Sequence, residues 1–202
     1  MNNDNEARGG VLILPGGKPR SAAISRAWQP ANQRMMWLAW SLRRNLGGRV
    51  DVRRVQYRKR GWNSPALDAL CDAEDALIRM RCDLRCDNVI LVGHSMGARV
   101  AVHLAAAQDV SGVVALAPWW PCDDATLVPK RCRLLTVHGT ADTWTDPRSS
   151  LAQTLWARER GVDAQWIGVP EAGHYLLHRF RLWHRLTYQF ITEELHERLR
   201  EA

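Results

Sequence analysis

The sequence is poor in lysine, in tyrosine and phenylalanine, and in long apolar runs. Lysine supplies three of its 28 basic residues, and with 21 acidic residues the formal net charge is +7. A general bias of the composition towards arginine explains this charge better than a surface that binds nucleic acid or membrane lipids does. Charge alone does not identify a binding partner. No stretch reaches the roughly 18 uninterrupted apolar residues of a membrane span, and the amino terminus is polar. We therefore expect no membrane insertion, no export and no nucleic-acid binding.

The cysteines show neither a disulfide pattern nor a zinc-binding pattern. The five cysteines are an odd number, and Cys82 and Cys86 have no second pair at zinc-like spacing. Cys122 has no base beside it in the sequence, so we treat it as incidental. Free thiols in a reducing cytoplasm fit this pattern best. We expect a cytoplasmic protein without a metal ion or other cofactor, since no histidine pair has metal-ligand spacing with a carboxylate.

The length of 202 residues suffices for one substantial core and is too short for two ordinary domains. Apolar runs alternate with longer stretches of helical spacing, which indicates an α/β fold: a mostly parallel sheet with helices on both faces. We expect one domain over residues 1–202, with frayed ends at 1–9 and after Leu199. The predicted strands are 11–14, 50–57, 88–92, 112–116, 133–137 and 164–169. The predicted helices are 34–46, 65–80, 96–107, 149–160 and 182–199.

Charge patterning distinguishes central from peripheral strands. Residues 11–14 and 88–92 are continuous apolar runs, as is typical of strands buried on both faces. Residues 50–57 interleave arginines with apolar side chains, and arginine on an edge strand blocks unwanted pairing. We therefore place the second strand at an edge of the sheet.

The third predicted strand runs into Gly93-His94-Ser95-Met96-Gly97 and then into an alanine-rich helix. So sharp a turn between strand and helix forces the central serine into a strained backbone conformation. Side chains two residues before and after it would collide with the adjoining strand and helix, and glycine at both positions avoids these collisions. The motif predicts Ser95 as the nucleophile.

A serine nucleophile requires a histidine base and an acid that orients it. Asp142 follows the fifth predicted strand and His174 follows the sixth. Because the carboxyl ends of parallel strands open on one rim of a sheet, Ser95, Asp142 and His174 can converge there.

Other residues compete for these roles. Asp146, Asp123 and Asp124 are alternative acids, but we favour Asp142. Three further histidines follow the acid near or within the last helix, where packing or solvation explains them: His178, His184 and His196. We interpret His94 and His138 as structural.

These motifs, in the order Ser, Asp, His, resemble those of the α/β-hydrolase superfamily. The resemblance spans about residues 10–195 and points to the small carboxylesterases and the dienelactone-hydrolase-like group. It implies a six-stranded sheet in the order 2-1-3-4-5-6, which agrees with the edge position inferred above. It also implies an oxyanion hole made by the amide of Met96 and an amide after the first strand. There Pro15-Gly16-Gly17 replaces the His-Gly-x of relatives, so Gly17 is the expected donor and Gly16 the alternative.

Tryptophans follow strands at the same rim. We expect Trp119 and Trp144, together with Gly16, to contact substrate, and Trp120 also lies there. Four more tryptophans have helical spacing and are expected in the core: Trp37, Trp40, Trp156 and Trp183. The basic segment 57–62 could steer an anionic substrate, but a solvated loop is the reading we favour.

The resemblance implies a function. Many relatives carry a cap of helices between the fourth and fifth strands, whereas only about residues 117–132 join them here. An open site favours small esters or accessible acyl groups. We expect a serine esterase or thioesterase; the dienelactone group generally uses cysteine, so Ser95 argues for ester cleavage. A peptidase or amidase with the same triad and a non-catalytic binding protein are the alternatives.

Overall fold

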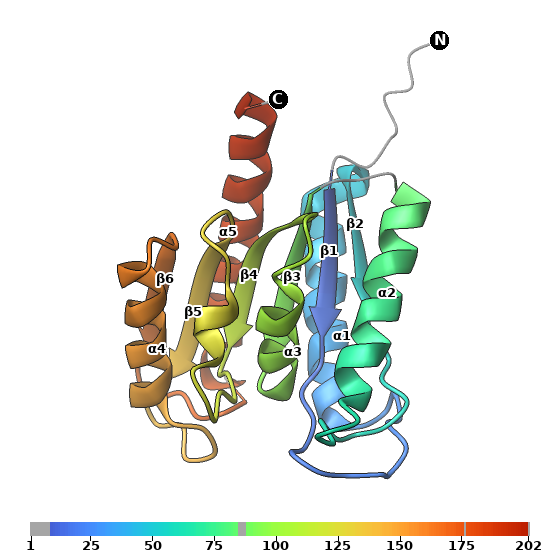
Figure 1. The fold of residues 1–202 in the computed structure, drawn as a ribbon, viewed down its shortest axis with the longest axis vertical. Helices are drawn as coiled ribbons and strands as arrows, with labels where there is room; N and C mark the ends of the chain where they lie inside the picture. Colours follow the sequence, from blue (N-terminus) through green and yellow to red (C-terminus); the bar gives the residue numbers. More distant parts are fainter. Residues whose placement is uncertain (1–8, 85–87, 176, 202) are drawn as a thin grey trace.

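A parallel six-stranded sheet forms the centre of the computed structural model, which describes residues 9–84, 88–175 and 177–201 (Figure 1). The strand order is β2-β1-β3-β4-β5-β6 and every neighbouring pair is parallel, so the predicted fold class and order are confirmed. The strands are β1 (Gly9–Leu14), β2 (Val50–Arg54), β3 (Val89–His94), β4 (Val110–Leu116), β5 (Arg133–Gly139) and β6 (Ala164–Val169). The helices are α1 (Pro30–Leu46), α2 (Asp68–Leu84), α3 (Met96–Leu104), α4 (Pro147–Glu159) and α5 (Phe180–Glu201).

Helices cover both faces of the sheet. Helices α1 and α5 pack on one face, and α2, α3 and α4 pack on the other (Figure 1). Alternate side chains of a strand point to opposite faces, so β1 sends Val11 and Ile13 to the α1 and α5 side and Leu12 and Leu14 to the other. Two apolar cores result, one on each face of the sheet.

The second strand lies at an edge of the sheet, as its charges predict. It pairs with β1 alone, and Arg53 forms ion pairs with Asp51 and with Asp83 of α2. The strand ends at Arg54 rather than at residue 57, although the buried Tyr57 beyond it still belongs to the core.

Several other predicted boundaries shift. Helix α2 begins at Asp68 rather than at 65, because Asn63 and Leu67 have φ values of 56° and 52°, outside the helical range. Helix α3 ends at Leu104 rather than at 107. Gly9, expected to be frayed, begins β1, and α5 continues to Glu201. Residues 1–8 lie outside the described part of the chain.

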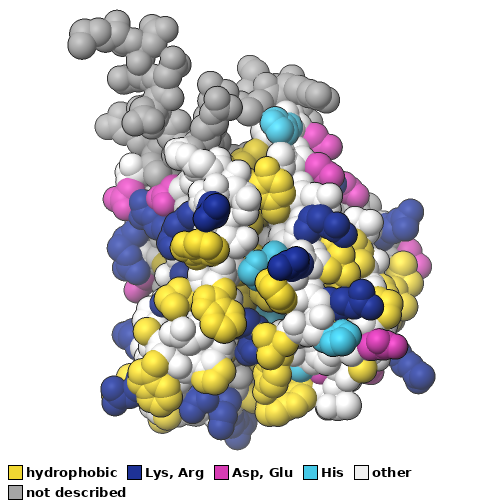
Figure 2. All heavy atoms as spheres, turned by 180° about the vertical axis from the view of Figure 1, so that it is seen from behind, with side chains coloured by type: hydrophobic (Ala, Val, Ile, Leu, Met, Phe, Trp, Pro, Cys, Tyr) yellow, Lys and Arg dark blue, Asp and Glu magenta, His cyan; other side chains and the backbone are white. Residues whose placement is uncertain are grey.

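The prediction that four tryptophans at helical spacing belong to the core is wrong for three of them. Trp37, Trp40 and Trp156 are 58%, 63% and 47% exposed, whereas Trp183 is 2% exposed. The buried face of α1 is instead formed by smaller residues such as Met35 and Leu38. Figure 2 shows the face of the molecule over α1 and α5, where hydrophobic side chains lie among arginines and lysines.

The connection from β4 to β5 is short. Its single helical element is η2 (Asp124–Leu127), one turn of 3-10 helix, so no cap is inserted there, as the sequence predicts. None of the described helices combines the length and apolar character needed to cross a bilayer. Cys71, Cys82 and Cys122 are exposed free thiols, Cys132 is buried, and Cys86 lies outside the described residues.

Candidate active site

The turn between β3 and α3 holds Ser95 in a backbone conformation that side chains rarely adopt, with φ 55° and ψ −117°. The flanking glycines make the turn possible, because a Cβ at Gly93 would collide with the carbonyl of Gly97, and one at Gly97 with the carbonyl of Leu14. The amide of Ser95 donates to the carbonyl of Leu116 on β4, at 2.9 Å. The serine is thereby fixed at the carboxyl end of the central strands.

His174 lies beside Ser95. Its Nε2 is 3.1 Å from Ser95 Oγ, and its Nδ1 is 2.8 Å from Asp142 Oδ2. A carboxylate only accepts hydrogen bonds, so Nδ1 carries the proton and Nε2 presents its lone pair to the serine hydroxyl. This is the tautomer in which His174 can accept a proton from Ser95.

Asp142 is surrounded by hydrogen-bond donors. Oδ1 accepts from the amides of Trp144 and Thr145, at 2.7 and 3.1 Å. Oδ2 accepts from Thr145 Oγ1 at 2.8 Å and from His138 Nε2 at 3.0 Å, besides His174. Although burial opposes the charge, these hydrogen bonds hold the pKa of Asp142 well below its ordinary value, so the carboxylate stays ionised.

The loops that carry the acid and the histidine are joined to each other. The amide of Ala141 donates to the carbonyl of Ala172 at 3.0 Å, and the amide of Thr140 donates to the carbonyl of Val169 at the same distance. A Cβ at Gly139 would collide with the carbonyl of Ala172, so glycine permits this close approach. Asp142 and His174 are therefore positioned by one packed unit.

His94, expected to be structural, supports the histidine loop. Its Nε2 donates to the carbonyl of His174 at 2.9 Å, while its Nδ1 is buried without a partner. Burial, together with the nearby charges of His174 and Arg34, lowers the pKa of His94 to about 3. His94 is therefore neutral at neutral pH.

The expected oxyanion donors lie next to each other. Met96 is the first residue of α3, so its amide has no partner within the helix, and the positive end of the helix dipole is directed there. A Cβ at Gly17 would meet the side chain of Met96, and one at Gly16 would lie 3.4 Å from Ser95 Cβ. Both Gly16 and Gly17 line the cavity that contains Ser95.

This cavity has a volume of about 470 Å³ and is walled by side chains from several loops. Trp144 lies over His174, with ring centroids 6.0 Å apart and the rings 13° from parallel. Arg34, Tyr175 and Leu177 also line it, and the ring centroids of Tyr175 and Trp144 are 5.8 Å apart. Trp119 lies instead in a neighbouring hollow of about 310 Å³, which also contacts Trp144.

The competing acids have other partners. Asp146 caps α4 by accepting from the amide of Arg148, and Asp124 forms an ion pair with Arg99 at 2.8 Å. Asp123 is exposed at the start of η2.

The competing histidines lie away from the serine. His178 and His196 are exposed, and His184 packs against Trp183. In the described part of the chain, no group of three or more His, Cys, Asp or Glu side chains is arranged to hold a metal ion.

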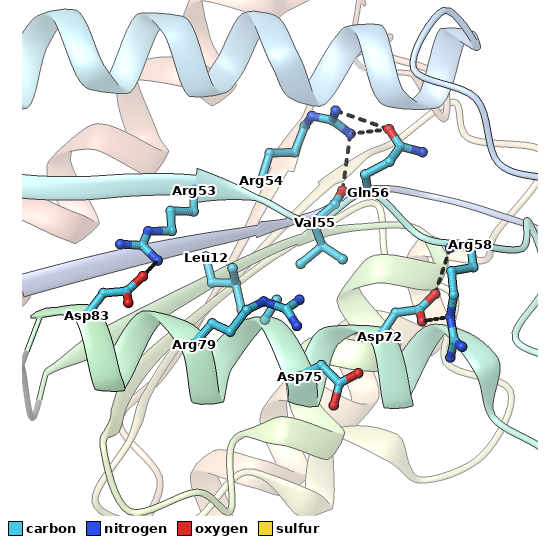
Figure 3. Close-up of a pocket in the computed structure, with 11 residues that line it drawn as sticks. Leu12, Arg53, Arg54, Val55, Gln56, Arg58, Asp72, Asp75, Arg79 and Asp83 are labelled. Atoms are coloured by element: carbon cyan, nitrogen blue, oxygen red, sulfur yellow. Dashed lines mark hydrogen bonds and ion pairs between the residues drawn. The ribbon is translucent and has the colours of Figure 1, made fainter.

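A third hollow, of about 460 Å³, lies between β2 and α2 (Figure 3). Its charges are largely compensated within it, since Arg53 pairs with Asp83 and Arg58 with Asp72. None of the described residues that line it is a serine, cysteine or histidine. Unlike this hollow, the cavity at Ser95 holds a candidate nucleophile.

Comparison with known families agrees with this geometry. The model of the alpha/beta hydrolase family matches residues 11–186. The chain belongs to this α/β-hydrolase family. No curated protein matches it in sequence.

Among solved structures, this α/β hydrolase is similar to Est1E from Butyrivibrio proteoclasticus with bound ferulic acid. The TM-score is 0.72 at 14% identity, over 96% of this chain and 92% of that one. It is also similar to an acetyl ester-xyloside bifunctional hydrolase from Caldicellulosiruptor lactoaceticus, with a TM-score of 0.71 at 15% identity over 96% and 85% of the chains. XC6422 from Xanthomonas campestris, a serine hydrolase without a lid, gives a TM-score of 0.64 at 18% identity over 91% and 81%. At these identities the likeness concerns the fold.

Sequence reasoning assigned no role to Thr145 or Arg34, and it interpreted His138 only as structural. Thr145 and His138 both contact Asp142, and Arg34 lines the cavity from α1. The proximity of His138 and Thr145 to Asp142 in the sequence was a usable signal. Arg34 gave none, because one arginine among 25 in the chain stands out only when its surroundings are known.

Proposed function

We propose that this α/β hydrolase is a serine hydrolase that cleaves small or accessible carboxylic esters or thioesters through an acyl-enzyme at Ser95. The observation that carries the proposal is the hydrogen-bonded chain from Ser95 Oγ through His174 to Asp142, with distances of 3.1 and 2.8 Å. A neutral imidazole oriented by an ionised carboxylate is the arrangement that activates a serine hydroxyl.

In the proposed first step, Ser95 Oγ attacks the carbonyl carbon while its proton passes to His174 Nε2. Asp142 accepts the hydrogen bond of the imidazolium that forms, and the amides of Gly17 and Met96 donate to the oxyanion, with Gly16 as the alternative donor. The bond to the leaving group then breaks, and His174 gives its proton to the departing oxygen or sulfur.

In the second step, water attacks the acyl-enzyme with His174 again accepting the proton. The bond between the acyl carbon and Ser95 Oγ breaks, and the serine recovers its proton. General-base assistance of this kind contributes about 10²- to 10⁴-fold, and each oxyanion donor about 10²- to 10³-fold.

The cavity favours small substrates. Its volume of about 470 Å³ suits a short acyl or aryl group, and the short connection after β4 leaves its mouth without a cap. Trp144 is positioned to contact such a group, whereas Trp119 would contact only a substrate that extends past Trp144. The ferulic acid and acetyl ester named for the two similar structures support esters as the substrate class.

The test is a series of 4-nitrophenyl esters from acetate to palmitate, with initial rates measured for the wild type and for Ser95→Ala. We expect hydrolysis of the short esters, a decline with chain length beyond the capacity of the cavity, and loss of activity in Ser95→Ala. Equal activity of the two proteins would contradict the proposed nucleophile.

Two alternatives are separated by further measurements. A peptidase or amidase would cleave 4-nitroanilides of the same acyl groups at comparable rates. A non-catalytic binding protein would not react with a fluorophosphonate probe, whereas the proposed hydrolase is labelled and Ser95→Ala is not.

The proposal places this activity in a single domain that spans residues 1–202, in the cytoplasm, with neither metal nor cofactor. The free thiols among the described cysteines support a reducing compartment.

A further inference from the structure

The cavity at Ser95 is positively charged. Lys18, Arg34 and Arg60 line it, and no aspartate or glutamate is among its described lining residues. Asp142 is buried behind His174 and is engaged by the donors around it. A cleft lined by charge of one sign concentrates ligands of the opposite sign.

Two cations near the cavity are neutralised by carboxylates. In the basic segment 57–62, Arg58 pairs with Asp72 and Lys59 with Asp68, and both aspartates lie on α2. Arg60, the third cation of this segment, lines the cavity instead. The acidic residues of α2 therefore neutralise part of this segment and leave the side facing Ser95 uncompensated.

Arg34 is the deepest of these cations. It is 7% exposed, it has no ion pair or hydrogen bond with any described residue, and its Nε is buried without a partner. Its guanidinium carbon lies 4.4 Å from the centroid of the Tyr175 ring. Burial lowers the pKa of Arg34 below its ordinary value, which reflects the cost of keeping this charge away from water.

Two other partly buried arginines have carboxylate partners, and Arg54, which has none among the described residues, donates to Asn32, Gln56 and the carbonyl of Val55. Arg99 is paired with Asp124, and Arg133 with Asp163. A buried cation without such a partner is destabilising unless something compensates it, and packing alone would be served as well by an apolar side chain of similar length. Arg34 lines the cavity, so a ligand in the cavity can reach its guanidinium.

We infer that Arg34 binds a carboxylate of the substrate, so that the esters cleaved at Ser95 carry a carboxylate within reach of the scissile carbonyl. The inference rests on the proposed function and names its substrate class. The planar guanidinium suits a carboxylate, which it can hold with two parallel hydrogen bonds. Arg34 stacks on Tyr175, which follows His174 directly, so the bound carboxylate lies beside the base. Lys18 and Arg60 add attraction at the rim.

The test uses pairs of esters that differ only in methylation of the distal carboxylate. One pair is 4-nitrophenyl hemiglutarate and methyl 4-nitrophenyl glutarate, with the carboxylate on the acyl side. The other is 4-acetoxybenzoate and methyl 4-acetoxybenzoate, with the carboxylate on the leaving group. The measured quantity is the ratio of kcat/KM for the charged and the methylated ester, and the pair with the larger ratio identifies the side that Arg34 binds.

For the wild type we expect a ratio of at least about 10 in one pair, and in Arg34→Met a fall of that ratio by about 10- to 100-fold, the range for a hydrogen bond to a charged group. Arg34→Lys keeps the charge but loses the fork, so its ratio lies between the two. Arg44→Met removes an exposed arginine from the same helix, so it changes the net charge equally and keeps the wild-type ratio.

Three outcomes would overturn the inference or separate it from the proposed function. A wild-type ratio near 1 in both pairs, or a ratio that Arg34→Met leaves unchanged, overturns the carboxylate site while ester hydrolysis stands. A lower thermal midpoint in Arg34→Met with an unchanged ratio assigns Arg34 a structural role and likewise overturns it.

If the wild type cleaves none of the four esters, the proposed function fails and calorimetry decides about the carboxylate site. Monomethyl glutarate is titrated into Ser95→Ala and into the Ser95→Ala, Arg34→Met double variant. Binding that only the first protein shows supports the site, and equal behaviour of the two overturns it.

Discussion

At the scale of single residues, the chemistry of this hydrolase depends on where protons sit. Asp142 accepts from His174 Nδ1, which leaves Nε2 free to accept from Ser95. The same carboxylate accepts from Thr145 and His138, so its orientation does not depend on His174 alone. A carboxylate held in this way fixes both the tautomer and the plane of the imidazole.

Asp142→Asn is expected to lower kcat by about 10³- to 10⁴-fold with little change in KM, because an amide nitrogen facing Nδ1 favours the wrong tautomer. Steady-state kinetics on 4-nitrophenyl acetate measures this. Asp123→Asn, which alters an exposed acid outside the cavity, serves as the matched control and keeps full activity. Retention of more than a tenth of kcat in Asp142→Asn would argue that another group orients the histidine.

The candidate triad was predictable because each member lies in the loop or turn that follows a strand. The carboxyl ends of parallel strands all lie at one edge of the sheet, and a serine flanked by glycines marks a sharp turn from strand to helix. The positions of Arg34 and Trp119 were not predictable in this way. Arg34 reaches the cavity from a helix, and Trp119 lies on the far side of Trp144, so both depend on side-chain packing.

At the scale of elements, the junction of β1, β3 and α3 leaves no room for added atoms. A Cβ at Gly97 would overlap the carbonyl of Leu14, a backbone atom that cannot turn away. Close packing of this kind makes such positions sensitive to a single methyl group.

Gly97→Ala is therefore expected to destabilise the fold by at least about 2 kcal/mol, the middle of the range for overpacking. The free energy of unfolding in urea is the measurement. Gly48→Ala is the control, because a Cβ there meets nothing within 4 Å, and its stability should match or slightly exceed that of the wild type. Equal stability of the two variants would mean that β1 and α3 can separate at no cost.

Tryptophan provides a second comparison between elements. Trp183→Ala in α5 is expected to cost about 3 to 5 kcal/mol, because the ring is buried. Trp40→Ala in α1 should change stability by no more than about 0.5 kcal/mol, because its ring is largely exposed. Chemical denaturation measures both, and a large loss in Trp40→Ala would show that its ring is covered in solution.

Periodicity identified the elements better than it identified their buried faces. The spacing of Trp37 and Trp40 fits a helix, and the helix is there, but Met35, Leu38 and Leu42 form the face that meets the sheet. Strand positions were predicted closely because buried parallel strands are nearly continuous apolar runs. Boundaries failed where backbone dihedrals decide, as at Leu67 before α2.

At the scale of the whole molecule, buried neutral histidines link stability to pH. The folded state lowers the pKa of His94 to about 3 and that of His184 to about 4, in both cases mainly through burial. In the unfolded chain histidine titrates near 6.5, so below that pH the unfolded state binds more protons and is favoured.

The free energy of unfolding is therefore expected to fall between pH 7 and pH 5, with His94 alone contributing about 2 kcal/mol to the loss. Urea denaturation at both pH values measures it. His94→Gln keeps a donor towards the carbonyl of His174 but does not titrate, so its pH dependence should be shallower. His196→Gln, an exposed position, should reproduce the wild-type slope. An identical slope in His94→Gln and the wild type would contradict the neutral, buried state of His94.

The two ends of the described chain lie at the same end of the strands, where β1 begins (Figure 1). A Cβ at Gly9, where β1 begins, would touch the side chain of Leu195 near the end of α5. The loops with Ser95, Asp142 and His174 lie at the opposite end of the strands (Figure 1). A bead, electrode or fusion partner held at the start of β1 or at the end of α5 would therefore lie at the end of the strands opposite the cavity (Figure 1). An immobilised preparation of the enzyme would keep its cavity facing the surrounding liquid.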